Sequence, residues 1–201
     1  MGKRSRPDHF TDRAKRAGYS ARSVYKLEEL QKRFSLIRRG NNVLDVGAAP
    51  GSWSQFAAKI VGGEGAIVAV DLKEMPDLEA HANVRTFAGD IFEPTMVAEL
   101  ETLGPYDVVM SDAAPNTTGN RTVDTVRSAA LVEQVVALAQ SMLRDGGSLV
   151  AKIFQGGEEQ NLLAIARNHF ANARLIKPKA SRSESFETFL VATGFAPEAD
   201  Q

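Results

Sequence analysis

Hydrophobic positions along this chain follow two spacings that alternate over most of its length. Short runs rich in Val, Ile and Leu have the length of buried strands, and the longer segments between them repeat apolar residues every three or four positions, as amphipathic helices do. The pattern predicts strands over residues 42–47, 66–71, 83–88, 106–111, 147–154, 173–177 and 186–193. It predicts helices over residues 20–34, 52–61, 94–103, 122–144 and 158–170. This alternation indicates an α/β domain whose mostly parallel sheet is covered on both faces.

The final strand has a different connection from the others. It follows residues 173–177 without an intervening helix, whereas a parallel neighbour would need a long crossover. We therefore expect strand 186–193 to pair antiparallel near the edge of the sheet. No repeat or long linker divides the 201 residues, so we expect one domain over residues 1–201, with its core at 41–195 and a distinct segment at 1–40.

The composition is that of an ordinary globular protein, with 43% hydrophobic and 24% charged residues. There is no cysteine, which excludes disulfides, thiolate zinc sites and cysteine nucleophiles. His9, His81 and His169 lack the spacing of metal ligands, so we predict no metal site. No apolar run has the roughly 20 residues of a membrane helix, and the basic amino terminus lacks the apolar stretch of a signal peptide, so we expect a cytoplasmic protein without membrane contact.

The net charge of −1 conceals an uneven distribution. Residues 1–40 hold 12 of the 24 Lys and Arg but four of the 25 Asp and Glu, a local charge of +8 against −9 for the remainder. A basic segment on an acidic body favours contact with a polyanion such as RNA, although a solvated tail would have the same composition. Tyr19, Tyr25 and Phe34 offer apolar anchors, so we expect residues 19–34 to be docked.

The most informative local pattern is the segment Leu44–Trp53, where an apolar strand enters a turn of small residues and then a helix. Gly47 and Gly51 bracket a loop whose backbone can approach a bound group closely, and Ser52 is expected to cap the helix. The segment lacks both the phosphate-binding motif of ATPases and the third glycine of dinucleotide-binding proteins. It therefore predicts a site for a single nucleoside-like cofactor rather than for NAD.

Two acidic residues end the next strands of the predicted sheet, where ligands of such folds bind. Asp71 lies 20 positions after Gly51, the usual offset of a carboxylate that binds ribose hydroxyls. Asp90 follows the next strand and could accept a hydrogen bond from the amine of a base. The alternatives are a chance acid at a strand end for Asp71 and a carboxylate capping the following turn for Asp90.

Lys152 lies among apolar neighbours in a predicted strand, and an ammonium group is costly to bury without a partner. Asp112 ends the preceding strand and is expected to be that partner. The pair could serve structure alone. It could instead hold a lysine whose pKa is lowered by burial and neighbouring cations, so that its amine can accept a proton.

The segments around these residues occur together in one known family. They are Asp45–Trp53, Ser111–Asn116 and Lys152–Gly156, and further similarity extends from Ser23–Leu27 to Lys177–Gly194. In this combination the chain resembles the FtsJ-like 2′-O-methyltransferases, the family of ribosomal RNA large subunit methyltransferase E. The resemblance implies an S-adenosylmethionine-dependent enzyme with a Rossmann-like fold, whose seven-stranded, mostly parallel sheet has an antiparallel last strand.

The resemblance also implies which residues act. The family's catalytic tetrad falls on Lys26, Asp112, Lys152 and Glu187. Its cofactor contacts fall on Gly47, Gly51, Trp53, Asp71, Asp90 and Asp112. Lys152 is the expected proton acceptor and Asp112 the group that orients it, while the other two members would position the ribose. In two departures, Phe189 stands where the family pattern has Tyr, and Ser52 where many relatives have Gly.

The implied substrate is a uridine of 23S ribosomal RNA within the large ribosomal subunit, methylated by a monomer. Methylation of tRNA by the same chemistry and a non-catalytic role in ribosome assembly are the alternatives. A small-molecule methyltransferase or an NAD enzyme is disfavoured by the basic segment and the missing third glycine.

Overall fold

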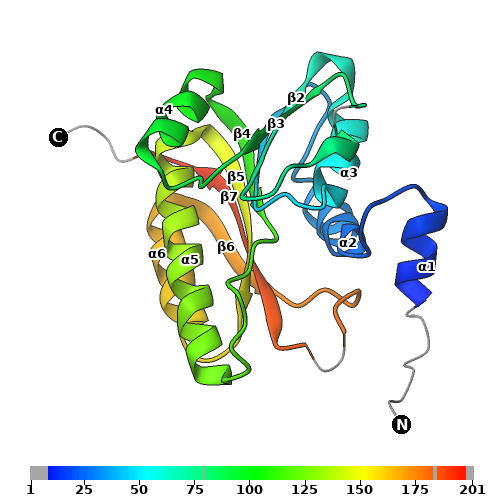
Figure 1. Ribbon diagram of the computed structural model, residues 1–201. Helices are drawn as coiled ribbons and strands as arrows, with labels where there is room; N and C mark the ends of the chain where they lie inside the picture. Colours follow the sequence, from blue (N-terminus) through cyan, green and yellow to red (C-terminus); the bar gives the residue numbers. More distant parts are fainter. Residues whose placement is uncertain (1–8, 79, 183–184, 198–201) are drawn as a thin grey trace, which may run out of the picture.

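The computed structural model describes residues 9–78, 80–182 and 185–197, and its centre is a seven-stranded sheet with helices on both faces (Figure 1). The strands are β1 (Asn42–Val46), β2 (Ala66–Asp71), β3 (Val84–Ala88), β4 (Tyr106–Ser111), β5 (Leu143–Phe154), β6 (Phe170–Ile176) and β7 (Glu187–Phe195). Their order across the sheet is β3-β2-β1-β4-β5-β7-β6. The predicted mostly parallel, seven-stranded α/β architecture is confirmed.

Strand β7 is antiparallel to both of its neighbours, β5 and β6. Its antiparallel direction and its place near the edge are as predicted, but β6 rather than β7 forms the edge itself. The connection over residues 177–186 allows this, because it is long enough to carry the chain past β6 and insert β7 beside β5. The insertion brings the amino end of β7 to the carboxyl end of β5.

The helices are α1 (His9–Arg16), α2 (Val24–Phe34), α3 (Ser52–Val61), α4 (Pro94–Leu103), α5 (Arg121–Met142) and α6 (Glu159–His169), with 3₁₀ turns at Gly62–Glu64 and Pro76–Leu78. Helix α2 begins four residues later than predicted. Helix α1 was not predicted, because Ala14 is its only buried residue and its apolar signal is weak. Strand β5 begins at Leu143, earlier than predicted, because an irregularity in its pairing with β4 accommodates the glycine turn at residues 146–147.

Alternate residues of the central strands divide the core between the two faces of the sheet. Leu44 and Val109 pack with α5 and α6 on one face, whereas Val43 and Val108 pack with α2 and α3 on the other. This period of two is the one expected of strands covered on both sides. The two layers leave the strand ends and their loops free to form a site.

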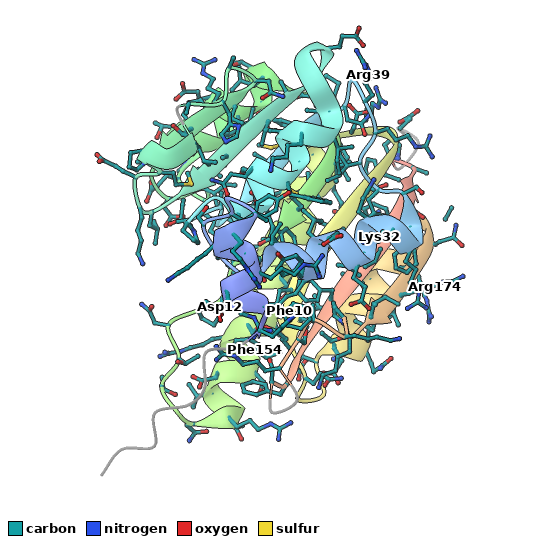
Figure 2. The ribbon with its side chains drawn as sticks, turned by 90° about the vertical axis from the view of Figure 1, so that its right-hand side faces the viewer. Phe10, Asp12, Lys32, Arg39, Phe154 and Arg174 are labelled. Atoms are coloured by element: carbon teal, nitrogen blue, oxygen red, sulfur yellow. The ribbon has the colours of Figure 1, made fainter. Side chains whose placement is uncertain are left out.

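The basic amino-terminal segment is docked over residues 9–34 rather than extended. Leu27 and Leu30 of α2 are fully buried against α3 and the sheet, in agreement with the predicted docking of residues 19–34. Helix α1 packs through Phe10, whose ring centroid lies 5.5 Å from that of Tyr25. Figure 2 shows α1 and α2 in front of the sheet, with Phe10 labelled by α1 and Lys32 labelled on α2.

Candidate active site

Four charged side chains from four parts of the fold meet beyond the carboxyl end of the central strands. Lys26 comes from α2, Asp112 directly follows β4, and Lys152 belongs to β5. Glu187 begins β7, and its place there depends on the antiparallel pairing that sets it opposite Phe154 of β5. The structure therefore brings together all four members of the tetrad predicted by resemblance.

The tetrad forms a chain of alternating charges, in the order Glu187, Lys26, Asp112 and Lys152. Lys26 Nζ lies 2.6 Å from Glu187 Oε1 and 4.0 Å from Asp112 Oδ1. Lys152 Nζ lies 3.1 Å from Asp112 Oδ1 and donates a hydrogen bond of 2.5 Å to the Asp112 carbonyl. The four side chains are between 11% and 18% exposed, so these ion pairs are weakly screened by water. The expected pairing of Lys152 with Asp112 is present.

Glu187 is held in its charged form by this arrangement. Burial by itself raises the pKa of its carboxyl group, but the hydrogen bond and the charge of Lys26, with smaller contributions from Ser181 and Lys152, together outweigh burial. The net result is a pKa below the ordinary value. Glu187 therefore remains a carboxylate at neutral pH and fixes the position of the Lys26 ammonium.

The loop after β1 approaches its neighbours so closely that it requires glycine at two positions. Gly47 has φ +69°, and a Cβ there would lie 2.5 Å from Ala113 Cβ. Gly51 has φ +99°, and a Cβ there would lie 2.8 Å from Leu78 Cγ. Both values lie in the left-handed region, which side chains other than glycine rarely adopt. The two predicted glycines therefore shape the loop through conformation and close packing.

The expected capping role of Ser52 is wrong. Gly51 occupies the capping position, in a left-handed conformation, so Ser52 is already the first helical residue and makes no side-chain cap. Its hydroxyl instead lies 3.0 Å from the hydroxyl of Ser23. Trp53 reinforces this contact, because its indole N–H donates a 3.0 Å hydrogen bond to the Ser23 carbonyl. The loop is thus joined to the residue that precedes α2.

The predicted cofactor residues divide between one cavity and its surroundings. Gly47, Trp53 and Asp112 line the same small cavity, together with Ser23 and Asp45. The loop is also tied to β2, because the Ala49 amide donates a 3.0 Å hydrogen bond to the carboxylate of the strand-ending residue at position 71. The small cavity and the tetrad therefore share one residue, Asp112.

Asp71 and Asp90 both bond to nearby backbone. Asp71 accepts from the amide of Lys73 at 3.0 Å through its second oxygen. Asp90 is exposed and accepts a 3.0 Å hydrogen bond from the amide of Phe92. The turn-capping alternative weighed for Asp90 is therefore present in the structure. Each carboxylate oxygen has a second lone pair, so these bonds leave acceptor capacity for a ligand.

Comparison with known proteins bears on the same part of the chain. Residues 19–195 match the FtsJ-like methyltransferase family. The chain belongs to this family. It is 48% identical over 193 residues to ribosomal RNA large subunit methyltransferase E of Treponema denticola, covering 96% of this chain and 97% of that protein. It is 45% identical over 190 residues to the protein of the same name in Desulfatibacillum aliphaticivorans, covering 94% and 91%.

Solved structures agree with the family assignment. A protein described as a ribosomal RNA methyltransferase of Plasmodium falciparum superposes with a TM-score of 0.78 at 26% identity, over 88% of this chain and 98% of that one. Fibrillarin of Aeropyrum pernix, solved with bound S-adenosyl-L-methionine, superposes with a TM-score of 0.61 at 17% identity, over 85% and 76%. The second likeness concerns the fold alone. The resemblance of the sequence motifs to FtsJ-like methyltransferases is confirmed.

One buried residue of this FtsJ-like site was missed in the sequence. Asp45 is 1% exposed and lines the cavity beside Gly47. Its Oδ2 accepts a 2.6 Å hydrogen bond from Ser54, whereas its Oδ1 has no hydrogen-bond partner among the described residues. Burial raises the pKa of Asp45 to about 7, against the opposing effect of Ser54 and with a further rise from the negative charge of Asp112. The sequence did contain a signal for this residue, because Asp45 is an acid within the apolar strand at residues 43–46.

A wider pocket of about 390 Å³ opens beside the tetrad and is lined by Arg22, Ser23, Lys26, Arg182, Ser185 and Glu187. Two guanidinium groups thus border one opening. Burial and the like charge of Arg182 lower the pKa of Arg22. Arg22 also donates a 2.5 Å hydrogen bond to the Ala180 carbonyl, which fixes the connection between β6 and β7. The lining thus combines three cationic side chains, Arg22, Lys26 and Arg182, with one carboxylate, Glu187.

The departure at Phe189 concerns packing. Its ring is fully buried and stacks on Trp53, with ring centroids 5.8 Å apart. Lys26 Nζ lies 5.7 Å from the centroid of the Phe189 ring.

Among residues 9–78, 80–182 and 185–197, no helix is long and apolar enough to cross a membrane. The same part of the chain holds no group of three or more potential metal ligands.

Proposed function

We propose that this FtsJ-like methyltransferase transfers a methyl group from S-adenosylmethionine to the 2′-hydroxyl of a uridine in 23S ribosomal RNA. The substrate would be the large ribosomal subunit, and the enzyme a cytoplasmic monomer. The names of its relatives support the choice of RNA. The observation that carries the proposal is the position of Asp112, which lines the cavity of the glycine loop and pairs with both tetrad lysines.

The residues around the loop fit the cofactor. Asp45, which lines the cavity, has a buried carboxylate oxygen with no hydrogen-bond partner in the described part of the chain, and this oxygen suits the ammonium of the methionine moiety. Asp71 has acceptor capacity for the ribose hydroxyls. Leu72 follows it and is 75% exposed, and an adenine ring would cover this apolar side chain. Gly47 and Gly51 allow the backbone to approach the ligand.

S-adenosylmethionine, when bound, supplies an electrophilic methyl group on a sulfonium. The Lys152 amine would accept the proton of the 2′-hydroxyl as that oxygen takes up the methyl group. Asp112 holds the Lys152 amine in place through the 3.1 Å contact. Lys26, fixed by Glu187, orients the ribose oxygen. The transfer would yield a 2′-O-methylribose, S-adenosylhomocysteine and protonated Lys152.

The surface around the tetrad supports an RNA substrate. Arg22 and Arg182 border the pocket that opens beside Lys26, where a phosphate adjacent to the target ribose would lie. Helix α1, which packs on Tyr25 of α2, carries Arg13, Lys15 and Arg16 in its last turn. Such contacts position the nucleic acid without reading its sequence. The basic segment at residues 1–40 is proposed to face the RNA for this reason.

Transfer of labelled methyl groups to RNA tests the proposal. Purified large subunits, 23S rRNA and tRNA from cells lacking the enzyme are incubated with labelled S-adenosylmethionine, and the methylated ribose is mapped. We expect incorporation at one uridine of 23S rRNA. Incorporation only into tRNA would move the proposal to the alternative substrate, and no incorporation into any RNA would overturn it.

A matched pair of variants tests the role of Lys152. Lys152→Arg keeps a cation that can pair with Asp112, but arginine does not lose its proton near neutral pH. We expect Lys152→Arg and Lys152→Ala both to lower kcat by about 100-fold or more, since general base catalysis contributes about 10² to 10⁴. Binding of S-adenosylmethionine, measured by calorimetry, should persist in both. A Lys152→Arg variant with the wild-type kcat would contradict the assignment of Lys152 as proton acceptor.

A further inference from the structure

An aromatic pair outside the core lies at the rim of the candidate active site. The rings of Phe154 and Phe186 have centroids 4.7 Å apart at an interplanar angle of 61°. The guanidinium carbon of Arg121 lies 5.2 Å from the centroid of the Phe186 ring. Both phenylalanines are only half-buried, and neither belongs to any of the four hydrophobic clusters of the described chain. Large aromatic side chains usually stabilise a core, and these do not.

The pair is fixed directly beside the catalytic tetrad. The register of β5 and β7 sets Phe154 opposite Glu187. Lys152 lies two residues before Phe154 on the same strand, so the two side chains share one face of the sheet. The carbonyl of Phe186 accepts a 2.7 Å hydrogen bond from the amide of Gln155, which holds the two ring-bearing backbones together. In Figure 2, Phe154 appears at the lower end of the sheet, below α1.

Arg121 is also placed by a defined local structure. It is the first residue of α5, and Asn120 caps this helix by accepting hydrogen bonds of 3.1 and 3.3 Å from the amides of Thr122 and Val123. The cap fixes the helix start from which Arg121 reaches the Phe186 ring. A guanidinium over an aromatic ring adds a planar, cationic surface that bases and phosphates both favour.

We propose that Phe154, Phe186 and Arg121 form a base-stacking site for the nucleotide whose ribose is methylated. This inference rests on the proposed function, because a ribose at Lys152 places its own base within reach of the strand end that carries Phe154. RNA bases that are removed from a helix stack on aromatic and arginine side chains. The enzyme would therefore select an unpaired, unstacked nucleotide, and it would tolerate different bases because every base has a π face.

The contribution of such a site is measurable in the kinetics. Stacking is worth about 5- to 100-fold in affinity per base by alanine substitution. Because the base does not react, the interaction is the same in the ground state and the transition state, so its loss raises KM for RNA and leaves kcat nearly unchanged. A pair that served only to close the ends of β5 and β7 would instead lower stability and displace Glu187, which would lower kcat.

The test uses the full chain and the RNA that the wild-type enzyme methylates. Phe186→Leu keeps an apolar side chain but removes the ring, and Phe186→Trp enlarges the ring. We expect Phe186→Leu to raise KM for RNA about 5- to 100-fold. Its kcat and its KM for S-adenosylmethionine should stay within about threefold of wild type. Phe186→Trp, which keeps a ring, should have a KM for RNA close to that of wild type. Thermal unfolding shows whether each variant folds. If Phe186→Leu does not fold, Phe154→Leu is used to repeat the test.

A second aromatic pair supplies the control. Phe170 and Phe195, with centroids 5.3 Å apart, are buried at the opposite end of β7 from Glu187. Phe195→Leu should lower the melting temperature without changing KM for RNA. Wild-type KM for RNA in a folded Phe186→Leu variant, or a fall in kcat alone, would overturn the stacking site and leave the proposed function intact. Absence of RNA methylation by the wild-type enzyme would overturn both.

Discussion

Replacement of Asp45 by Asn should make the protein more stable above neutral pH while weakening cofactor binding. Burial holds the pKa of Asp45 at about 7, from an ordinary value of 3.8. A folded-state pKa above the unfolded value means that protonated Asp45 contributes stability that is full below about pH 4 and is lost as the pH rises to 7. The difference of about 3 units, at 1.36 kcal/mol each, amounts to about 4 kcal/mol. The amide that Asp45→Asn introduces does not titrate, so the variant lacks this pH dependence.

The assay is urea unfolding of wild type and Asp45→Asn at pH 5 and pH 8. The free energy of unfolding of Asp45→Asn, relative to wild type, should rise by roughly 3 kcal/mol between these pH values, since part of the 4 kcal/mol is already lost at pH 5. Ser54→Ala, which removes the 2.6 Å hydrogen bond, should enlarge the pH dependence. Equal pH dependence in wild type and Asp45→Asn would refute the reasoning. Calorimetry should show weaker S-adenosylmethionine binding by Asp45→Asn.

Two further substitutions test the loop and the ion pair. Gly47→Ala should destabilise the loop and lower S-adenosylmethionine affinity at least tenfold, measured by calorimetry, because its Cβ would lie 2.5 Å from Ala113 Cβ at φ +69°; unchanged affinity would show that the loop relaxes freely. Glu187→Gln leaves the ammonium of Lys26 without its 2.6 Å partner and should lower the free energy of unfolding by about 3 kcal/mol in urea, whereas Lys32→Gln on the exposed face of α2 should cost about 0.5 kcal/mol. Equal losses of unfolding free energy in Glu187→Gln and Lys32→Gln would contradict the argument that burial makes the Lys26–Glu187 pair the more costly one to break.

Local patterns of the sequence predicted every strand and every helix except α1, together with one half of the site. Lys152 stood out as the one charged residue within the apolar run 149–154 of β5. A buried ammonium needs a neutralising partner, and this need pointed to Asp112. The role of the two glycines in the loop after β1 could also be predicted from the sequence, because it depends on backbone conformation. Strand β3 and helix α3 were placed within a residue by their spacing and turn residues.

Other parts of the site were recognised only through the family pattern. Neither Lys26, in an ordinary amphipathic helix, nor Glu187, at the start of a strand, has an unusual local sequence. Their 2.6 Å contact exists because α2 docks against the sheet and β7 inserts between β5 and β6. The resemblance of the sequence motifs to the family identified these residues, but only the topology explains why they lie together.

The sequence by itself therefore determined the strands, the helices other than α1, the glycine loop after β1 and the basic character of the first 40 residues. Tertiary structure alone decided the order of β6 and β7, the burial of Asp45 beside the cavity and the meeting of Phe154 with Phe186. The physical reason is the range of the interactions. Backbone conformation and amphipathic spacing are set by neighbours in sequence, whereas strand order, desolvation and charge pairing depend on which distant segments pack together.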